Sequence, residues 1–266
     1  MNRRIKFGVF ITLLSAVLVT CGVVIGSELL SRQKDKENFE QLAKLVTVKS
    51  PVASPTPTGP PAADEQPAAA KTPSPDSEEE SQGQLRDLSE LFAMNEDFVG
   101  WLCIPDTDIN YPVMHTPDEP EWYLRRNFQG EYSESGVPFL DFRCALDSDN
   151  LIIYGHNMMN GTMFAGLRRY VQKDFCEQHS VIEFQTIEGC AKYQVFAVAQ
   201  VKSNDDWYKF VNANTAEDFN SAVDKAMGKT LFQVGSSPEF GTQILTLSTC
   251  YDSAHNGRLL VLAAKL

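Results

Sequence analysis

Three residues of the kinds that acyl transfer through a thioester requires lie at the ends of apolar runs. Cys250 closes the run 246–250, and Arg258 opens the apolar run that follows it. His156 stands just beyond the run 151–154, far upstream in the chain. A thiol nucleophile, an imidazole that moves protons and a cation that stabilises an oxyanion together suit this chemistry.

The spacing of Cys250 and Arg258 predicts a β-hairpin. Asn256 and Gly257 form a turn signal between the two apolar runs. The thiol and the guanidinium would then flank one loop on neighbouring strands, where the cation lowers the thiol pKa and stabilises a developing oxyanion. Gly155 gives the third run a sharp exit, which would place His156 at the rim of the same sheet.

Taken singly, each of these residues has a plainer interpretation. A lone cysteine is usually inert, a lone histidine is usually structural, and an arginine that starts a strand is usually a surface charge. His255 is a rival base because it is close to Cys250 in sequence, although it falls in a polar loop. Asp252 either orients His156 or Arg258 or is a solvated loop carboxylate.

Short apolar runs with turn residues between them dominate the second half of the chain. This pattern predicts a mainly β domain and favours a closed or nearly closed barrel. The runs are 101–104, 137–142, 151–154, 181–184, 193–201, 244–249 and 259–264. Two helices are expected beside them, one over 84–97 and one over 215–228 that begins with a capping pair, Thr215 and Asp218.

The first half of the chain differs in composition. Residues 7–26 carry no charge and are long enough to span a bilayer, and Arg3, Arg4 and Lys6 precede them, which favours a cytoplasmic N-terminus and an exported body. A cleaved signal peptide and a lipoprotein modified at Cys21 are the alternatives. The expected division is 1–6 cytoplasmic N-terminus, 7–27 transmembrane anchor, 28–50 juxtamembrane helix, 51–83 proline-rich disordered linker and tether, and 84–266 catalytic domain.

Composition and motifs exclude several classes of function. The formal net charge of −12 argues against a nucleic-acid partner. No metal-ligand spacing, glycine-rich phosphate loop or Gly-x-Ser-x-Gly turn occurs, so we expect neither a metal nor any other cofactor. The remaining exported cysteines are either small buried residues or members of one or two disulfides; they are Cys103, Cys144, Cys176 and Cys190.

The ordered motifs resemble those of the sortases of class B. Thr246-Leu247-Ser248-Thr249-Cys250 is similar to the TLxTC signature of the family, and Arg258 falls where the family places its active-site arginine. Tyr154-Gly155-His156-Asn157-Met158 is similar to the class B histidine motif. Further similar stretches are 123–128, 135–141 and 160–164, so the resemblance covers about residues 84–266.

The resemblance implies an eight-stranded sortase barrel with an added N-terminal helix and a helix before the cysteine strand. It implies a transpeptidase that cleaves an Asn-Pro-x-Thr-like C-terminal sorting signal on an exported protein and transfers that protein to an amine of a lipid-linked peptidoglycan precursor. It assigns Cys250 as nucleophile, His156 as acid and base, and Arg258 as the oxyanion cation. The signal groove would include Leu124, Tyr154 and Ser248.

The resemblance also implies a place for the enzyme, which is the outer face of the membrane of a Gram-positive-type cell. Three alternatives stay open at the level of sequence. The acceptor could be a lysine side chain in a pilin-polymerising sortase, or water in a cysteine peptidase. The third alternative is a surface binding module without catalysis.

Overall fold

The structure is a computed structural model that describes residues 18–22, 26, 30, 33–48, 85–252 and 255–266. Its strands are β1 Thr47–Val48, β2 Arg86–Asp87, β3 Phe98–Cys103, β4 Asn110–Met114, β5 Phe139–Leu140, β6 Asn150–Tyr154, β7 Val181–Thr186, β8 Gly189–Lys202, β9 Ile244–Cys250 and β10 Gly257–Lys265. Its helices are residues 33–45, α3 Ser89–Met94, α4 Lys173–Gln178 and α5 Ala216–Met227, with 3-10 helices η1 Trp122–Arg125, η2 Phe164–Val171 and η3 Asp206–Lys209.

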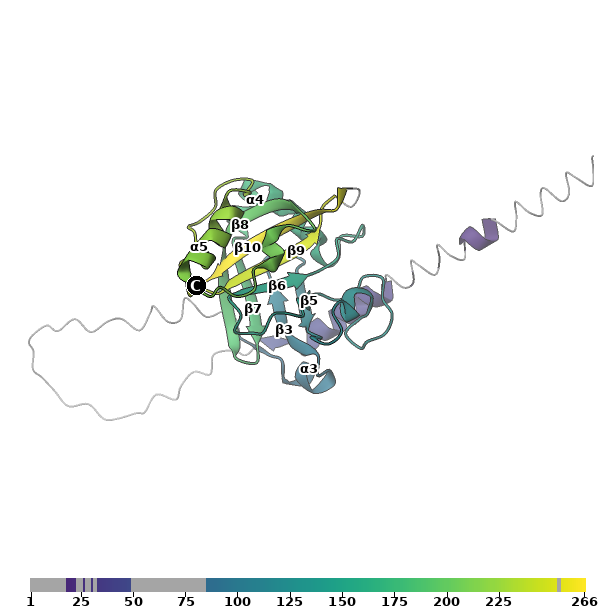
Figure 1. Cartoon of the computed structure of the whole chain (residues 1–266). Coiled ribbons are helices and arrows are strands. Elements are labelled where there is room, and N and C mark those ends of the chain that lie inside the picture. Colours follow the sequence, from purple (N-terminus) through teal and green to yellow (C-terminus); the bar gives the residue numbers. More distant parts are fainter. Residues whose placement is uncertain (1–17, 23–25, 27–29, 31–32, 49–84, 253–254) are drawn as a thin grey trace, which may run out of the picture.

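Eight of the strands close into a barrel, as the alternation of short apolar runs predicted. The order around the barrel is β10-β8-β7-β3-β4-β5-β6-β9, and β9 returns to β10 (Figure 1). Most neighbours are antiparallel, but two pairs run parallel, β4 with β5 and β6 with β9. The main hydrophobic core holds large side chains that are almost fully buried, among them Trp101 and Phe184, whereas Phe196 belongs to a second cluster that packs against α5. A parallel β6–β9 pair matters for function because it brings the carboxyl ends of two strands together.

Strand β4 was not among the apolar runs from which the strands were predicted. Its run contains Asn110 and Pro112, two residues that usually interrupt strands. β4 pairs with β3 along its length but with β5 only at Met114. A proline is tolerated there because most of the β5-facing edge of β4 needs no ladder hydrogen bond.

The helix expected over 84–97 is shorter in the structure and begins later. Arg86 and Asp87 are extended and form β2, and the helix α3 occupies only Ser89–Met94. Asp87 ends the extended segment, since its carboxylate accepts hydrogen bonds from the backbone N–H and the hydroxyl of Ser89. Leu88 and Leu91 are buried, so the apolar spacing was correct for the part that is helical.

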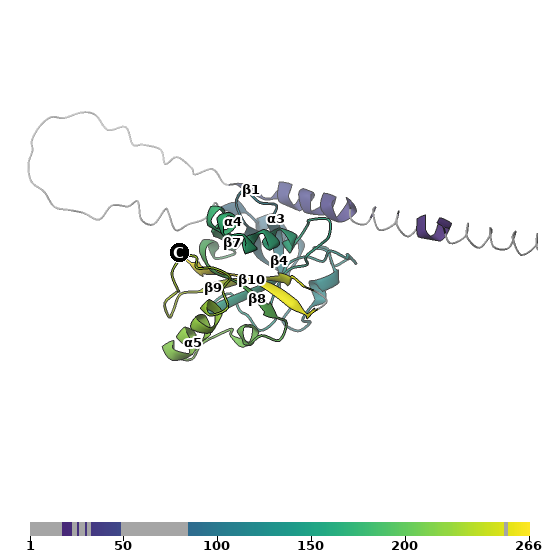
Figure 2. The same ribbon diagram turned by 90° about the horizontal axis from the view of Figure 1, so that it is seen from above.

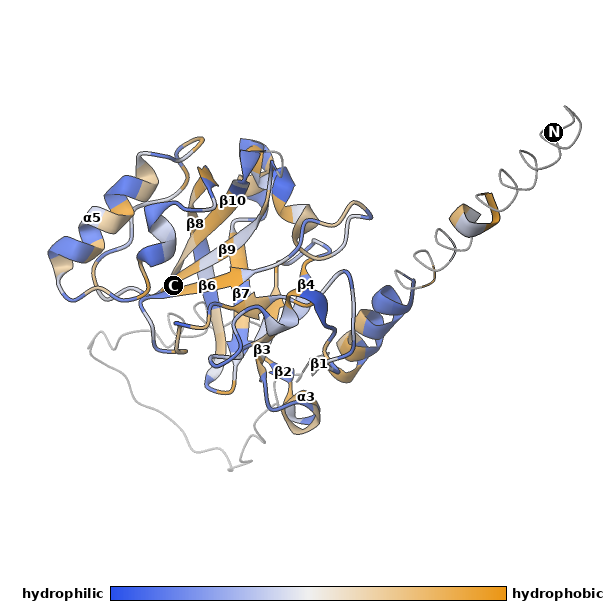
Figure 3. Cartoon of the chain, turned by 45° about the vertical axis from the view of Figure 1, so that its right-hand side comes forward, coloured by the Kyte–Doolittle hydropathy of each residue, from blue (hydrophilic) through white to orange (hydrophobic). Residues whose placement is uncertain are grey.

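The helix expected before the cysteine strand is present as α5. The Thr215 hydroxyl accepts a hydrogen bond from the backbone N–H of Asp218 at 3.1 Å, which is the capping interaction that the sequence indicated. Phe219, Val223 and Ala226 pack in one cluster with residues of β8 and β10. Figure 3 shows this amphipathic packing, with largely hydrophilic colour on α5 and hydrophobic colour along much of the barrel strands.

The segment before the proline-rich stretch, where a juxtamembrane helix was predicted over 28–50, contains a helix over residues 33–45. This helix lies beside the barrel (Figures 1 and 2). Most of the predicted membrane anchor, 7–27, lies outside the described residues, which include only 18–22 and 26 of it, and the predicted disordered linker, 51–83, lies outside them completely. Within the part of the chain that the structure describes, no helix combines the length and apolar character that a bilayer crossing needs.

Candidate active site

The register of three adjacent strands brings the predicted chemical residues to one end of the barrel. Tyr154 of β6 lies opposite Ser248 of the parallel strand β9, so the residues that follow, His156 and Cys250, leave the two strands at the same level. Cys250 in turn lies directly opposite Arg258 on β10. Directly paired residues of antiparallel strands extend to the same side of a sheet, so the thiol and the guanidinium share one face.

A cleft of about 650 Å³ opens at this end of the barrel. All six residues that the sequence assigned to catalysis or to the signal groove line it: Leu124, Tyr154, His156, Ser248, Cys250 and Arg258. The remaining lining includes aromatic side chains from the loop after β5 and from η3, together with the carboxylate residues Glu121 and Asp141. The cleft is therefore mainly apolar with a smaller number of polar groups, as ligand-binding clefts commonly are.

The loop after β6 fixes His156 by close packing and by one hydrogen bond. A Cβ on Gly155 would meet the ring of Phe164 at 2.6 Å, so only glycine allows this approach. The His156 Nε2 atom lies 2.8 Å from the carbonyl oxygen of Leu124 in η1. A carbonyl can only accept, so Nε2 carries a proton and Nδ1 is the free acceptor of the neutral ring.

Burial also determines the charge state of His156. It lowers the pKa of the imidazole below its ordinary value, and the positive charge of Arg125 acts in the same direction. The contact with the Leu124 carbonyl opposes this by favouring the charged ring. The ring is accordingly neutral at pH 7, with its exchangeable base position at Nδ1.

The Leu124 carbonyl is itself held in place by neighbouring chain segments. Gly136 adopts a left-handed φ of +58°, and a Cβ there would meet this carbonyl oxygen at 2.5 Å. The hydroxyl of the neighbouring Tyr123 donates to Asp97 at 2.8 Å and accepts from Asn95 at 3.0 Å. The hydrogen-bond acceptor of His156 therefore belongs to a well-supported turn.

Two side-chain hydrogen bonds join the end of β6 to the end of β9. The Asn157 amide donates to the backbone carbonyl of Cys250 at 2.8 Å, and the Thr249 hydroxyl donates to the carbonyl of Gly155 at 2.7 Å. These bonds continue the β6–β9 pairing past the last strand residues. They fix the backbone that carries His156 relative to the backbone that carries Cys250.

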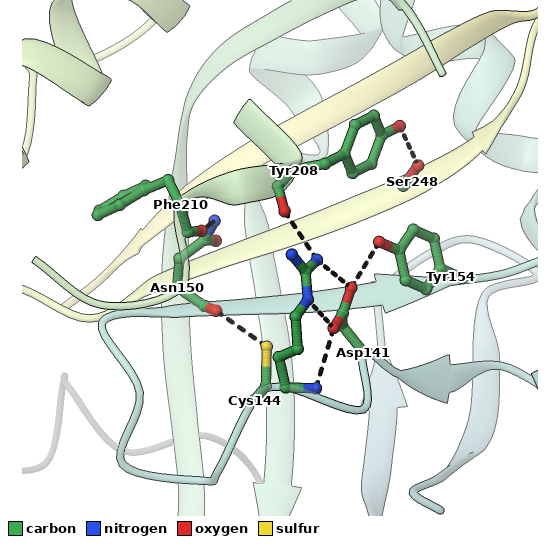
Figure 4. Close-up of polar contacts among 8 residues, drawn as sticks. Asp141, Cys144, Asn150, Tyr154, Tyr208, Phe210 and Ser248 are labelled. Carbon is green, nitrogen blue, oxygen red and sulfur yellow. Dashed lines mark hydrogen bonds and ion pairs between the residues drawn. The ribbon is translucent and has the colours of Figure 1, made fainter. Parts of the chain in front are cut away.

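One wall of the cleft is a polar network that joins segments far apart in sequence (Figure 4). The Arg143 guanidinium forms a bidentate pair with Asp141, at 2.8 and 2.7 Å, and also donates to the carbonyl of Tyr208 at 2.7 Å. The Tyr154 hydroxyl donates to Asp141 at 2.8 Å. A further bond of 2.8 Å joins the hydroxyls of Tyr208 and Ser248.

This network holds two tyrosine rings as the aromatic surface of the cleft. The rings of Tyr154 and Tyr208 stack with centroids 6.1 Å apart. Burial by itself raises the pKa of Asp141, but the hydrogen bonds from Arg143 and Tyr154 outweigh it and keep the pKa below its ordinary value. The carboxylate therefore stays ionised, and it accepts from both partners at neutral pH.

Sequence reasoning missed three residues of this wall: Asp141, Arg143 and Tyr208. Asp141 ends one of the motif stretches, 135–141, and that was the available signal. Arg143 and Tyr208 carry none, because η3 lies far from β5 in the chain and only the folded barrel brings them together. Leu124 was assigned as a groove residue, and its carbonyl contact with His156 was not foreseen.

The rival histidine lies elsewhere. His255 is 83% exposed at its side chain, and its Nδ1 atom lies 2.6 Å from a carboxylate oxygen of Asp252. Neither residue lines the cleft. The backbone carbonyl of Asp252 also accepts from Gly257 at 2.7 Å, so Asp252 shapes the loop between Cys250 and Arg258. An orienting effect of Asp252 on His156 or Arg258 stays a prediction.

The other four cysteines of the barrel domain differ from Cys250 in their surroundings. All six cysteines of the chain are free thiols, which answers the question that the sequence left open about disulfides. Burial raises the pKa of Cys144 and Cys190 to about 11, that of Cys176 to about 12, and that of Cys103 above its ordinary value. These four thiols stay protonated at neutral pH and do not line the cleft.

Comparison with known proteins agrees with this geometry. The family model described as "Sortase domain" matches residues 102–266. Sortase B of Listeria monocytogenes is 35% identical over 173 residues, which are 63% of this chain and 69% of that protein. The Staphylococcus aureus sortase B–substrate complex is 30% identical, with a TM-score of 0.63 over 67% of this chain and 84% of that one.

A second solved structure extends the structural similarity toward the N-terminus. Sortase B from B. anthracis in complex with AAEK1 covers 90% of this chain and 99% of its own, with a TM-score of 0.69 at 23% identity. The barrel, the cleft and these matches lead to one assignment. The chain belongs to the sortase family, class B, and is a cysteine transpeptidase that processes sorting signals.

Proposed function

We propose that Cys250, His156 and Arg258 are the catalytic residues. The Cys250 sulfur attacks the carbonyl carbon of the threonine in the sorting signal and forms a tetrahedral oxyanion. Arg258, directly opposite on β10, stabilises that charge. Collapse breaks the peptide bond and leaves a thioester on Cys250. The single observation that carries this proposal is the common level of all three residues at one barrel end, inside one cleft.

Proton transfer in this scheme uses Nδ1 of His156. The Leu124 carbonyl occupies the Nε2–H, so Nδ1 is the position at which a proton can arrive from the thiol and leave for the departing amine. In the second half of the reaction the same atom takes a proton from the incoming amine. The amine then attacks the thioester, and Cys250 is released as the thiol.

The cleft wall supports a peptide signal of the Asn-Pro-x-Thr type as the substrate. The stacked rings of Tyr154 and Tyr208 offer a flat apolar surface that suits a proline, and proline reduces the ordering cost of an extended ligand. Leu124 adds apolar surface to the cleft, and the Ser248 hydroxyl is hydrogen-bonded to that of Tyr208. A short polar and proline-containing signal fits this combination of surfaces.

The family assignment and the sequence together support a proposal for the acceptor and the location. The proposed acceptor is an amine of a lipid-linked peptidoglycan precursor. The uncharged stretch 7–26 after three basic residues supports a single-pass anchor, with the catalytic domain on the outer face of the cell membrane. The protein partners would be exported chains that carry a C-terminal sorting signal.

Product analysis tests the proposed function. The purified full chain is incubated with a peptide that contains an Asn-Pro-x-Thr signal, with and without a short glycine peptide as the amine, and the products are weighed by mass spectrometry. We expect cleavage after threonine, a product joined to the amine, and a covalent intermediate on Cys250. The Cys250→Ala variant should show none of these, whereas Cys190→Ala should retain them.

Each alternative predicts a different product. Hydrolysed peptide alone, at every amine concentration, would identify a peptidase that uses water. A product joined only to a lysine side chain of a pilin-like peptide would identify a polymerising sortase. Binding of the peptide without cleavage would identify a binding module.

A further inference from the structure

Two paired strands connect the ends of the proline-rich segment. β1 and β2 are antiparallel, with Thr47 opposite Asp87 and Val48 opposite Arg86. The intervening segment, 49–84, lies outside the described residues, but both of its ends are therefore at one point of the domain. A segment whose ends are adjacent adds no distance between the parts of the chain on either side of it.

The second of these strands is fixed to the barrel. The backbone N–H of Arg86 donates to the side chain of Gln185 on β7 at 2.7 Å, and the Gln185 amide donates back to the Arg86 carbonyl at 2.6 Å. The Arg86 guanidinium forms a buried ion pair with Glu183 at 3.0 Å. β1 pairs with a strand that is itself part of the folded domain.

The helix before β1 is docked on the barrel as well. Leu42 is 2% exposed within the main hydrophobic core, and the ring of Phe39 packs edge-on against Tyr111 of β4 with centroids 5.4 Å apart. The buried carboxylate of Asp35 accepts a hydrogen bond from the hydroxyl of Ser133 at 2.7 Å. Residues 33–48 are thus held by an apolar face, a buried polar contact and a strand pair.

The docked helix touches segments that build the active site. The hydroxyl of Tyr111, under Phe39, accepts a hydrogen bond from the backbone N–H of Met163 at 3.1 Å. The next residue, Phe164, donates its backbone N–H to the carbonyl of His156 at 2.8 Å and packs on Gly155. The N-terminal end of the helix contacts the loop that follows η1, where Lys34 pairs with Glu131 and Asp35 accepts from Ser133.

We propose that residues 33–48 are an integral part of the catalytic domain and that the proline-rich segment is an insertion between two paired strands. The segment was expected to act as a tether, and an extended chain of its length would reach roughly 120 Å. Instead, the chain N-terminal to residue 33 joins the domain directly through a docked helix, which is roughly 20 Å long.

This arrangement defines which substrates can reach the cleft, a consequence that rests on the proposed membrane anchor. An active site joined to the anchor through a docked helix stays near the membrane surface. The sorting signal and the amine would then come from molecules that are held in the same membrane, such as a lipid-linked acceptor. A long tether would instead let the site reach acceptors deep in the cell wall.

Cutting the segment tests the proposal without any reference to catalysis. A single protease site is placed within 51–83 of the full chain, the purified protein is cut, and the two fragments are followed by size-exclusion chromatography in detergent. We expect the fragment that carries residues 33–48 to coelute with the barrel. Separation of the folded fragments under native conditions would overturn the proposal.

Variants on the helix sharpen this test. In the cut protein, Phe39→Ala combined with Asp35→Ala should release the N-terminal fragment, whereas Glu40→Ala combined with Lys44→Ala should not, because the latter side chains are exposed. Near-ultraviolet circular dichroism of the released barrel checks that it remains folded. Equal retention in both double variants would contradict the assigned contacts.

Shortening the segment tests the membrane consequence. Replacement of 51–83 by four Gly-Ser residues should leave transfer to a lipid-linked amine in vesicles, and to a soluble amine, within about twofold of the original rate. If the segment were a tether, the shortened protein would lose transfer to the vesicle-bound amine and keep transfer to the soluble amine. If no amine is accepted by any variant, the proposed function fails, while the cutting experiment still decides the docking of the helix.

Discussion

Cys250 and Arg258 are directly paired residues on the antiparallel strands β9 and β10. The loop between them contains Asp252, whose backbone carbonyl accepts from Gly257, so the hairpin is closed on the side of the loop as well. In the proposed mechanism, a guanidinium on the strand position opposite Cys250 would stabilise the negative charge that develops on the substrate.

Removal of this cation should therefore affect the chemical step. Arg258→Ala is expected to lower kcat about 100- to 1000-fold in the transpeptidation assay, since one oxyanion donor contributes about that factor. Arg258→Lys should recover part of the loss, because it keeps the charge without the planar donor geometry. A loss below tenfold for the alanine variant would remove Arg258 from oxyanion stabilisation.

The two histidines near the hairpin should behave differently. His156→Ala is expected to lower kcat/KM about 1000-fold, because it removes the group that transfers the proton. His255→Ala, at an exposed position outside the cleft, should stay within about twofold. The reverse ranking in the same assay would make His255 the base.

Gly155 should be intolerant of any side chain. Gly155→Ala places a Cβ 2.6 Å from the Phe164 ring, and such overpacking costs roughly 1–3 kcal/mol of stability. The strand exit would shift and move His156, so kcat should also fall. Gly228→Ala is the matched control, because its Cβ meets only ordinary contacts at 3.5 Å. Urea unfolding and steady-state kinetics on both variants measure the difference.

Asp141 should position the tyrosine wall without a role in the chemical step. Asp141→Ala leaves the Arg143 charge and the Tyr154 hydroxyl without their shared partner, at a cost of about 2–3 kcal/mol. In Asp141→Ala, the KM for the peptide should rise by a larger factor than kcat falls. The KM of Asp141→Asn should lie between those of the original chain and the alanine variant. Asp206→Asn, at a fully exposed ion pair, should change neither quantity. A fall in kcat with an unchanged KM in Asp141→Ala would contradict this assignment.

Acid should weaken the fold through two partly buried histidines. Burial lowers the pKa values of His115 and His156 below the ordinary 6.5 in the folded protein, so the unfolded chain binds more protons at mildly acidic pH. Their contribution is present above pH 6.5 and is lost as the pH falls toward the folded-state values. Urea unfolding at pH 7.5 and pH 5.5 should show a smaller drop in stability for His115→Gln/His156→Gln than for the original chain.

The sequence was sufficient where local pattern determines structure. Alternating apolar runs predicted the barrel, the Thr215 cap predicted the start of α5, and the Asn256-Gly257 turn predicted the hairpin that pairs Cys250 with Arg258. It failed where local signals conflict with tertiary pairing. Pro112 concealed β4, and the extended conformation of Arg86 depends on β1 and β7, which no local periodicity reveals.

By itself the sequence determined which residues are candidates for the chemistry, because a thiol, an imidazole and a guanidinium are side-chain properties and their order along the chain can be read directly. Only the tertiary structure decided how they are held. The acceptor of the His156 proton is the Leu124 carbonyl, and every residue has a carbonyl. Likewise, Asp141 meets Tyr154 and Arg143 meets Tyr208 because the closed barrel brings distant segments together, and such contacts have no local signature.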